Sequence, residues 1–374
     1  MVVIEIREVN TYRDLKKFVN FQYKLYRGNK YWVPPLRMDE INTLREDKNP
    51  AFDFCEAKYW LAVKDGEIVG RIAGIINNMY IEKWGTRNAR FGWVDFIDDQ
   101  EVSKKLFETV EAWAMDKGMT GIHGPLGFCD LDREGLLVDG FDEMGTFTTI
   151  YNYPYYPLHF EKHGYVKDVD WLEYELTIPN QIPDVIEKAS QNALKRFHLK
   201  VLDAKKPKDL LPYVKGIFQL LNNAYSDLYG VVPLTDKQIE LYTRQYFGFV
   251  NPDYVKIVLD QNDNVVAFGI AFPSLTLALR KTNGRLFPFG FIYLLDALKR
   301  NNMIDLCLVA VKPELQGKGV NAILMKEIHA KCVKNGIIKA QCNPQLESNI
   351  KVRTQWKYFD TKQHKRRRCY IKYF

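Results

Sequence analysis

The sequence predicts a mixed α/β protein built from two consecutive units of similar element order. Three observations support this: strands and helices alternate along the chain, two hairpin signals occupy equivalent places in the two halves, and a polar break flanked by Pro179 and Pro183 separates them. The length of 374 residues fits two or three domains of ordinary size. We therefore predict domains over residues 1–179 and 180–374, related by duplication of one fold; a chance match of strand orders is the alternative.

The first half is predicted to open with a strand over Val2–Val9 and an amphipathic helix from Tyr12 to Tyr26. Asp65-Gly66 lies between two apolar runs and predicts a β-hairpin. The strands of this hairpin are predicted over Lys58–Lys64 and Glu67–Ile76. They are followed by a strand over Arg90–Ile97, a helix over Glu101–Lys117 and a short strand over Gly121–His123. After a Tyr-rich helix that ends at Gly164, two final strands are predicted over Tyr165–Lys167 and Trp171–Ile178.

The second half repeats this order. Helices are predicted over Val185–Phe197, Leu210–Ser226, Asp236–Phe247, Val320–Lys334 and Leu346–Tyr358. Strands are predicted over His198–Leu202, Met303–Val311, Ile337–Cys342 and Arg367–Tyr373, and a hairpin pairs Tyr254–Leu259 with Val265–Phe272. An apolar insertion over Pro273–Asn301 is too short to span a membrane. Three roles are considered for this insertion: it packs as core, it lies at an interface, or it covers an acyl or acceptor pocket.

The composition is that of a folded, reduced protein. Hydrophobic residues make up 47% and charged residues 26% of the chain, enough for a core and too few charges for disorder. No long apolar run predicts a transmembrane helix, and the N-terminus lacks the pattern of a signal peptide. The six cysteines form no Cys-x-x-Cys pair, which argues against a zinc site and a disulfide framework. We expect a cytoplasmic protein with no metal site.

The positive charge is concentrated at one end. The chain has 53 Lys and Arg against 46 Asp and Glu, a net of +7, whereas residues 350–374 alone carry nine cations and one Asp, a net of +8. The first 349 residues are therefore net −1. The run Lys365-Arg366-Arg367-Arg368 faces an anionic ligand, nucleic acid or solvent. Because the rest of the chain is not basic, we do not expect nucleic-acid binding.

A glycine-rich loop carries the strongest chemical signal. A buried strand ends at Val311, Pro313 breaks it, and Gln316-Gly317-Lys318-Gly319 opens the next helix. Such a loop offers backbone N–H groups and the positive end of a helix dipole to a phosphate. The glycine spacing is neither that of a Walker loop nor that of a dinucleotide-binding loop. On spacing alone, an ordinary strand–turn–helix junction is the alternative.

This segment resembles motif A of the GCN5-related N-acetyltransferase (GNAT) superfamily, in which Arg/Gln-x-x-Gly-x-Gly/Ala binds the pyrophosphate of acyl-coenzyme A. Gln316 and Gly319 match, and the lead-in Val311–Glu314 is typical; Asn321 departs, since Gly or Ala is usual there. The resemblance implies two GNAT-like (acyl-CoA N-acyltransferase) domains in tandem, each with a mixed α/β sheet. It also implies that acetyl-CoA or a longer acyl-CoA is the substrate.

The resemblance further implies roles for single residues. Coenzyme A would contact the backbone N–H groups of the strand, the loop and an Asn of the last helix: Val309, Val311, Gln316, Gly317, Lys318, Gly319 and Asn349. Asp305 matches the position of the general base, which takes a proton from the ammonium group of the acceptor; a solvent-facing carboxylate is the alternative. Trp356 stands where a Tyr acid is usual, so Tyr358, the nearest phenol, is the candidate acid toward the thiolate.

The first half is predicted to lack the cofactor site. Its equivalent junction has no glycine, and Asp98 and Asp99 would cap the helix and repel a pyrophosphate. The loop Gly124–Asp142 is rich in glycine and carboxylates, including Asp130, Asp132, Glu134, Asp139 and Asp142. It lacks the register of a calcium loop. It is expected either to bind the amine of an acceptor or to be an ordinary surface loop.

These observations favour an acyltransferase that moves an acetyl or other acyl group from acyl-CoA to a small-molecule or peptide amine. One alternative is a tRNA-dependent aminoacyl transferase of the FemABX kind, which also has two GNAT-like halves. A second alternative is a non-enzymatic ligand-sensing protein with a decayed GNAT site. It is supported by Asn321 and Trp356, which depart from the family pattern.

Overall fold

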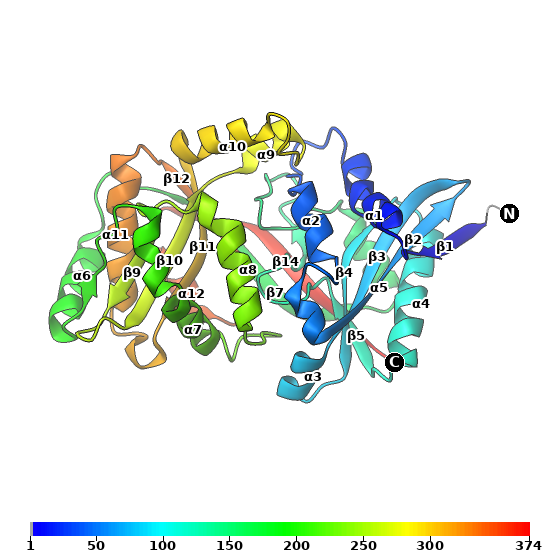
Figure 1. Ribbon diagram of the computed structural model, residues 1–374, viewed down its shortest axis with the longest axis horizontal. Helices are drawn as coiled ribbons and strands as arrows, with labels where there is room; N and C mark the ends of the chain where they lie inside the picture. The colour runs from blue at the N-terminus through cyan, green and yellow to red at the C-terminus, as the bar shows by residue number, and fades with distance from the viewer. Residues whose placement is uncertain (1–2) are drawn as a thin grey trace. The chain divides into compact units, whose positions relative to one another are not determined.

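The computed structural model describes residues 3–374, and the chain divides into two compact units (Figure 1). The first unit comprises the described part of Met1–Leu172 together with Thr276–Tyr293 and Lys365–Phe374; the second comprises Glu173–Leu275 and Leu294–His364. The structure therefore divides the chain differently from the predicted boundary at residues 179 and 180. The difference arises because the insertion and the closing strand contribute to the first unit.

The first unit is built on a mixed sheet with strand order β1-β2-β3-β4-β5-β14. Neighbouring strands are antiparallel except for the parallel pair β4 and β5. The predicted hairpin is confirmed: Asp65 and Gly66 have φ of 52° and 79°, as a tight turn with two left-handed residues requires. The strands are β1 (Ile4–Glu8), β2 (Cys55–Lys64), β3 (Glu67–Asn77), β4 (Asn88–Phe96), β5 (Gly121–Gly124), β6 (Leu136–Asp139), which pairs with β14, and β14 (Thr361–Tyr373).

Helices cover both faces of this sheet. Ile72 and Ala73 are consecutive on β3, so their side chains point to opposite faces. Ile72 packs in a core with Leu106 of α4, whereas Ala73 packs in a second core with Phe18 of α1. The helices of this unit are α1 (Tyr12–Leu25), α2 (Arg37–Thr43), α3 (Asn78–Trp84), α4 (Gln100–Asp116), α5 (Tyr155–Lys162), α9 (Thr276–Thr282) and the start of α10 (Gly290–Lys299).

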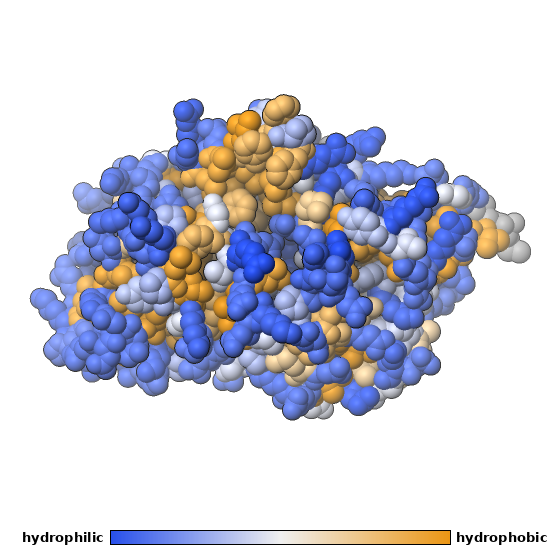
Figure 2. All heavy atoms as spheres, in the orientation of Figure 1, coloured by the Kyte–Doolittle hydropathy of each residue, from blue (hydrophilic) through white to orange (hydrophobic). Residues whose placement is uncertain are grey.

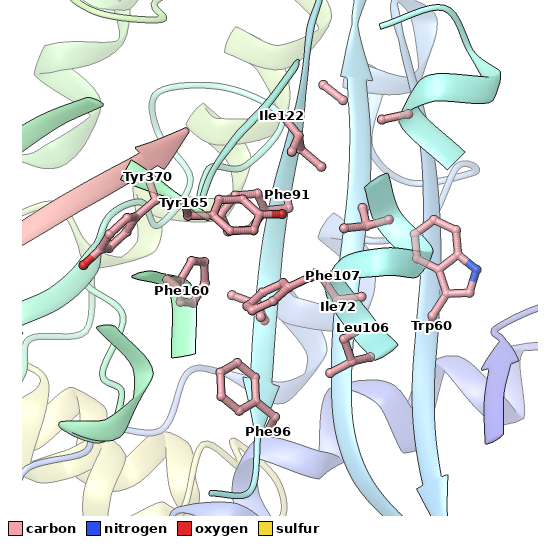
Figure 3. Close-up of a cluster of buried hydrophobic side chains, with 14 of the residues drawn as sticks. Trp60, Ile72, Phe91, Phe96, Leu106, Phe107, Ile122, Phe160, Tyr165 and Tyr370 are labelled. Carbon is pink, nitrogen blue, oxygen red and sulfur yellow. The ribbon is translucent and has the colours of Figure 1, made fainter. Parts of the chain in front are cut away.

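Aromatic side chains form the core between this sheet, α4 and α5 (Figure 3). The Phe107 and Phe160 rings lie 4.7 Å apart, and Phe160 stacks on Tyr370 of β14 at 5.2 Å. Both phenylalanines also contact Tyr165, at 5.1 and 5.4 Å. Because Tyr370 is fully buried here, the closing strand of the chain completes the core of the first unit.

The second unit has the strand order β7-β12-β11-β10-β9-β8. Only β11 and β12 are parallel. The predicted bounds of β11 and α11, Met303–Val311 and Val320–Lys334, are confirmed. The other elements are α6 (Asp184–Arg196), β8 (Lys200–Val201), α7 (Val214–Ala224), α8 (Asp236–Tyr246), β9 (Val255–Leu259), β10 (Val265–Pro273), β12 (Lys339–Cys342), and β7 (Val166–Thr177), which begins in the first unit.

Two sequence predictions in the last elements are wrong. The two strands predicted over Tyr165–Lys167 and Trp171–Ile178 form the single strand β7. The helix predicted over Leu346–Tyr358 is broken into β13 (Gln345–Leu346), a one-turn α12 (Ile350–Arg353) and a 3₁₀ segment, η5 (Thr354–Tyr358). The β-branched residues of this segment lower its helix propensity, and Asn349 caps only the single α-turn.

The basic end of the chain is bound within the first unit. Arg366 Nη1 and Arg368 Nε donate to the two carboxylate oxygens of Asp170 at 2.9 and 2.8 Å. Lys365 Nζ donates to the Met144 carbonyl at 2.9 Å. Two of these arginines therefore neutralise a carboxylate of the fold itself, Asp170. That the chain does not bind nucleic acid stays a prediction.

Asp170→Asn should destabilise the protein by about 3 kcal/mol near neutral pH, because two arginines lose a buried counter-charge. Burial acts to raise the pKa of Asp170, but hydrogen bonds from Arg368 and Arg366 outweigh it and lower that pKa below its usual value. The stabilisation is therefore present above pH ~4 and disappears as the pH falls through the lowered pKa. Denaturant unfolding from pH 3 to pH 7 is the measurement, with exposed Asp116→Asn as the control. A pH-independent loss would show that charge is not the cause.

Candidate functional site

The second unit contains a point where two parallel strands part. β11 pairs with β10 from Ile304 to Val311, but with β12 only from Met303 to Leu306. Asn343, directly after β12, donates its backbone N–H to the Leu306 carbonyl at 3.0 Å and its side-chain amide to the Cys307 carbonyl at 3.2 Å. β12 ends here, so the last five residues of β11 have an open edge on the side away from β10.

The predicted cofactor residues of β11 lie along this open edge. The carbonyl of Val309 accepts from the Tyr225 hydroxyl at 3.1 Å, and that of Val311 accepts from Gln316 Nε2 at 3.2 Å. The next residue, Lys312, donates its N–H to β10 instead. Because the N–H and C=O of a strand residue point to the same side and alternate along the strand, the N–H groups of Val309 and Val311 point toward the open edge.

The predicted glycine loop connects β11 to α11 through two left-handed residues. Gly317 and Gly319 have φ of 70° and 82°, which other residues adopt only with strain. Gly319 is the N-cap of the 15-residue α11, and the first turn receives no side-chain cap from it. A Cβ on Gly319 would lie 3.3 Å from the Ala189 carbonyl of α6. The loop therefore presents an uncapped positive helix end, suited to an anion.

The equivalent junction of the first unit is closed by its own carboxylates. Asp99, the N-cap of α4, accepts from the Glu101 N–H at 3.0 Å and pairs with Lys64 at 2.7 Å. Asp98 accepts from His159 Nε2 at 3.0 Å, if that nitrogen carries the proton. Asp99 therefore caps α4 as the sequence predicted, whereas Asp98 bonds to His159 and does not cap the helix. That the first unit does not bind a pyrophosphate stays a prediction.

Asn321, the residue that departs from the family pattern, is turned toward η5. Its side-chain amide donates to Gln355 Oε1 at 3.3 Å. The Asn side chain is thus held by a neighbouring segment of the same unit.

Asp305 is buried in the sheet, with only 1% of its surface exposed. It lies between Phe272 of β10 and Gln341 of β12, just before the two strands part. Burial, followed by the charge of Asp305, raises the pKa of the Cys307 thiol well above its usual value. The alternative of a solvent-facing carboxylate at a strand end is therefore wrong, and Asp305 is a buried carboxylate beside the open edge.

The three predicted residues after β12 lie on the broken helix. Asn349 caps α12 by accepting from the Val352 N–H at 3.3 Å. Trp356 donates its indole N–H to Gln345 at 3.1 Å. Tyr358 is exposed, with the Lys357 ammonium 4.9 Å from its ring centre. No hydrogen bond among the described residues joins Asn349, Trp356 or Tyr358 to β11.

Sequence reasoning missed two residues of this site. Tyr225 follows α7 and is 84 positions away from the strand carbonyl to which it donates. Asn343 holds the point of strand divergence. No local pattern indicated Tyr225, because only the packing of α7 against β11 brings it there. An Asn directly after a buried strand was the available signal for Asn343.

The carboxylate-rich loop of the first unit is half-buried. Asp132 accepts from the N–H groups of Phe128 and Cys129 at 2.8 and 3.4 Å. Burial raises the pKa of Asp130 and of Asp132 to about 6, although the Arg90 cation opposes both shifts. Burial, with Asp130 next, raises the pKa of Glu134 well above its usual value. Perturbed carboxyls of this kind occur in functional sites and in structural networks, so both expectations for this loop stay predictions.

Three other side chains of the first unit are arranged as metal ligands can be. The donor atoms of His123, Asp168 and Cys369 lie within 4.8 Å of one another, and His123 Nδ1 is 3.9 Å from Asp168. Burial lowers the pKa of His123, which favours the neutral imidazole. No local sequence pattern indicated this group, since its members come from three distant strands. The expectation of a protein without metal stays a prediction, which metal analysis of the purified protein checks.

Comparisons with known proteins agree with this architecture. No family model matches the chain. The chain is 28% identical over 366 residues to protein YghO of Escherichia coli K12, covering 96% of this chain and 93% of that protein. It is 27% identical to the bacterial ceramide synthase of Caulobacter vibrioides, covering 92% and 91%. A tandem GNAT protein from the clavulanic acid biosynthesis pathway superposes with a TM-score of 0.57 at 10% identity, covering 99% and 98%. The chain has the tandem GNAT fold.

Asp130→Asn should stabilise the protein at pH 8 by about 1 kcal/mol and change little near pH 4. Because the pKa of Asp130 is raised from 3.8 to about 6, the folded state binds more protons between those values. Wild-type stability therefore falls as the pH rises through this window, and the neutral Asn removes part of that fall. Denaturant unfolding at pH 4, 6 and 8 is the measurement, with exposed Asp142→Asn as the control. Equal pH profiles for wild type and D130N would contradict the assignment.

Proposed function

We propose that this protein transfers an acyl group from acyl-CoA to an amine acceptor, with the acyl-CoA held by the second unit. The observation that carries the proposal is the open edge of β11 leading into the uncapped N-terminus of α11 through Gly317 and Gly319. A strand edge and a positive helix end, in this order, suit a ligand with an amide-containing arm and a pyrophosphate.

The cofactor would follow the chain from α11 back along β11. The pyrophosphate would accept hydrogen bonds from the loop Gln316–Gly319 and the first turn of α11. The pantetheine arm would pair with the N–H groups of Val309 and Val311, in the manner of an added strand. This brings the thioester toward the point of strand divergence, where Cys307 and the buried Asp305 lie.

The chemistry follows from the order of these groups. Asp305, directly or through water, accepts a proton from the acceptor ammonium, and the neutral nitrogen attacks the thioester carbonyl. The new C–N bond forms as the C–S bond breaks, the nitrogen loses its second proton to water, and the coenzyme A thiolate takes a proton from an acid. Tyr225, bonded to the Val309 carbonyl, is our first candidate for that acid, and Tyr358 remains the second. Asn349 is kept as a cofactor contact in this proposal.

A long-chain amine with a long-chain acyl-CoA is the substrate pair that we propose first. The support is the similarity to the Caulobacter protein named bacterial ceramide synthase, since a ceramide is the amide of a fatty acid and a long-chain amino alcohol. All six cysteines are free thiols, which supports a reducing, cytoplasmic location. The burial of the basic end against Asp170 speaks against the tRNA-dependent alternative.

Two loop variants test the cofactor site. Gly319→Glu and Gln316→Glu should each weaken acyl-CoA binding by at least tenfold, because each adds a negative charge to the loop proposed to bind the pyrophosphate. Gln316→Glu needs no unusual backbone conformation and so controls for misfolding of the Gly319 variant. Gly248→Glu adds the same charge in open space on the same unit and should change nothing. Calorimetry with palmitoyl-CoA is the measurement; unchanged affinity in both loop variants would remove the proposed site.

Asp305→Asn should lower the transfer rate by roughly 10²–10⁴ while acyl-CoA affinity holds. The loss should shrink as the pH rises, because a growing share of the acceptor amine is already neutral. The pH–rate profile with a long-chain amino alcohol is the measurement, and Glu175→Gln, on β7 beyond β12 in the same sheet, is the control. A wild-type rate for the Asn variant at neutral pH would leave water or a residue of the first unit as the base. Binding of acyl-CoA without turnover of any amine would favour the ligand-sensing alternative.

A further inference from the structure

The insertion contributes an apolar segment, residues 276–293, that is anchored at its base to the first unit. The Arg37 N–H donates to the Gly284 carbonyl at 3.0 Å, and Arg280 Nη1 donates to the Trp32 carbonyl at 3.3 Å. Gly284 passes so close to Pro35 that a Cβ would lie 2.0 Å from its carbonyl oxygen. The base of the segment is therefore held by specific contacts that leave little freedom.

The remainder of this segment carries apolar side chains that no part of its own unit covers. Phe287 and Phe289 are 78% and 68% exposed, and their neighbours are also exposed: Leu277, Phe291, Ile292 and Tyr293. Figure 2 shows hydrophobic side chains gathered over α9 and α10. A patch of this kind marks an interaction surface, because monomeric soluble proteins rarely expose large contiguous apolar areas. Ala278 and Leu279 of the segment are buried and do pack as core, whereas the six exposed residues do not.

The charges of the segment identify the kind of partner. Arg280, Lys281 and Arg285 are its only ionisable groups apart from Tyr293, and it contains no Asp or Glu. The Lys281 ammonium lies 4.1 Å from the centre of the Tyr293 ring, beside the apolar residues. Exposed aromatic rings flanked by cations suit the interface of an anionic lipid bilayer, with the rings at headgroup depth and the cations on phosphates.

We propose that residues 276–293 dock the protein on an anionic membrane surface. A second copy of the chain fits less well, because a symmetric contact of this patch with itself would oppose three cations to three. The proposed contact is peripheral, with the segment lying at the lipid surface. A bilayer-spanning helix is not found in residues 3–374. The proposal goes beyond the acyl-transfer activity and does not depend on it, since it concerns binding to lipid alone.

Vesicle co-sedimentation with the full-length protein tests this proposal. Binding should be strong to phosphatidylcholine vesicles containing about 30% phosphatidylglycerol, weak to phosphatidylcholine alone, and reduced by salt. Phe287→Ser with Phe289→Ser should weaken binding at least tenfold, because two exposed anchors are lost without disturbing a core. Lys281→Gln with Arg285→Gln should weaken it about fivefold per cation and flatten its salt dependence.

Two controls make the result specific. Leu158→Ser removes another exposed apolar side chain of the first unit and should bind vesicles like the wild type. Lys104→Gln with Lys162→Gln removes two exposed cations of the same unit, away from the segment, and should also have little effect. Equal vesicle binding by the Phe287/Phe289 variant and the wild type would overturn the proposal. So would a wild-type protein that ignores vesicles but forms a dimer abolished by the same two substitutions.

Discussion

The structure of the second unit depends on the early end of one parallel strand pair. The pairing of β12 with β11 ends at Leu306, and Asn343 fixes the point where the strands part by donating hydrogen bonds to the carbonyls of Leu306 and Cys307. The residues of this edge from Leu306 to Val309 are half-exposed or exposed, so a ligand can approach the strand there. In our proposal the amides of the ligand add to β11 as a further strand, and β11 leads from there to the N-terminus of α11.

The two units differ in how the N-terminus of the helix is capped at their equivalent strand-to-helix junctions. Each has a strand that runs through a short turn into a long helix. In the first unit Asp99 caps α4 with its own carboxylate, whereas in the second Gly319 leaves the first turn of α11 without a side-chain cap. A helix end that is already neutralised has little left for a phosphate, and one that is bare retains its dipole field. A single residue at each N-cap thus explains how one fold, used twice, supports one proposed cofactor site per chain.

The features that depend on local sequence signals could be predicted accurately, whereas the contacts that depend on long-range packing could not. The bounds of β11 and α11 were predictable because an apolar run, a proline and two glycines punctuate them within the sequence. The tandem GNAT fold followed from element order with the loop motif. The partners of the basic end were not predictable, since Asp170 lies almost 200 residues from Arg366 and Arg368. For the same reason Tyr225 could not be predicted as a site residue, although its hydroxyl donates to the Val309 carbonyl of the strand that carries the proposed site.

The central claim is that one unit of this chain, and not both, holds the acyl donor. Native mass spectrometry of the 43.8 kDa protein titrated with palmitoyl-CoA tests it most directly. The account predicts a single saturating adduct of one palmitoyl-CoA per chain, which persists when Asp98 and Asp99 are both changed to Asn. Two equivalent adducts per chain, or none at saturating concentration, would contradict it.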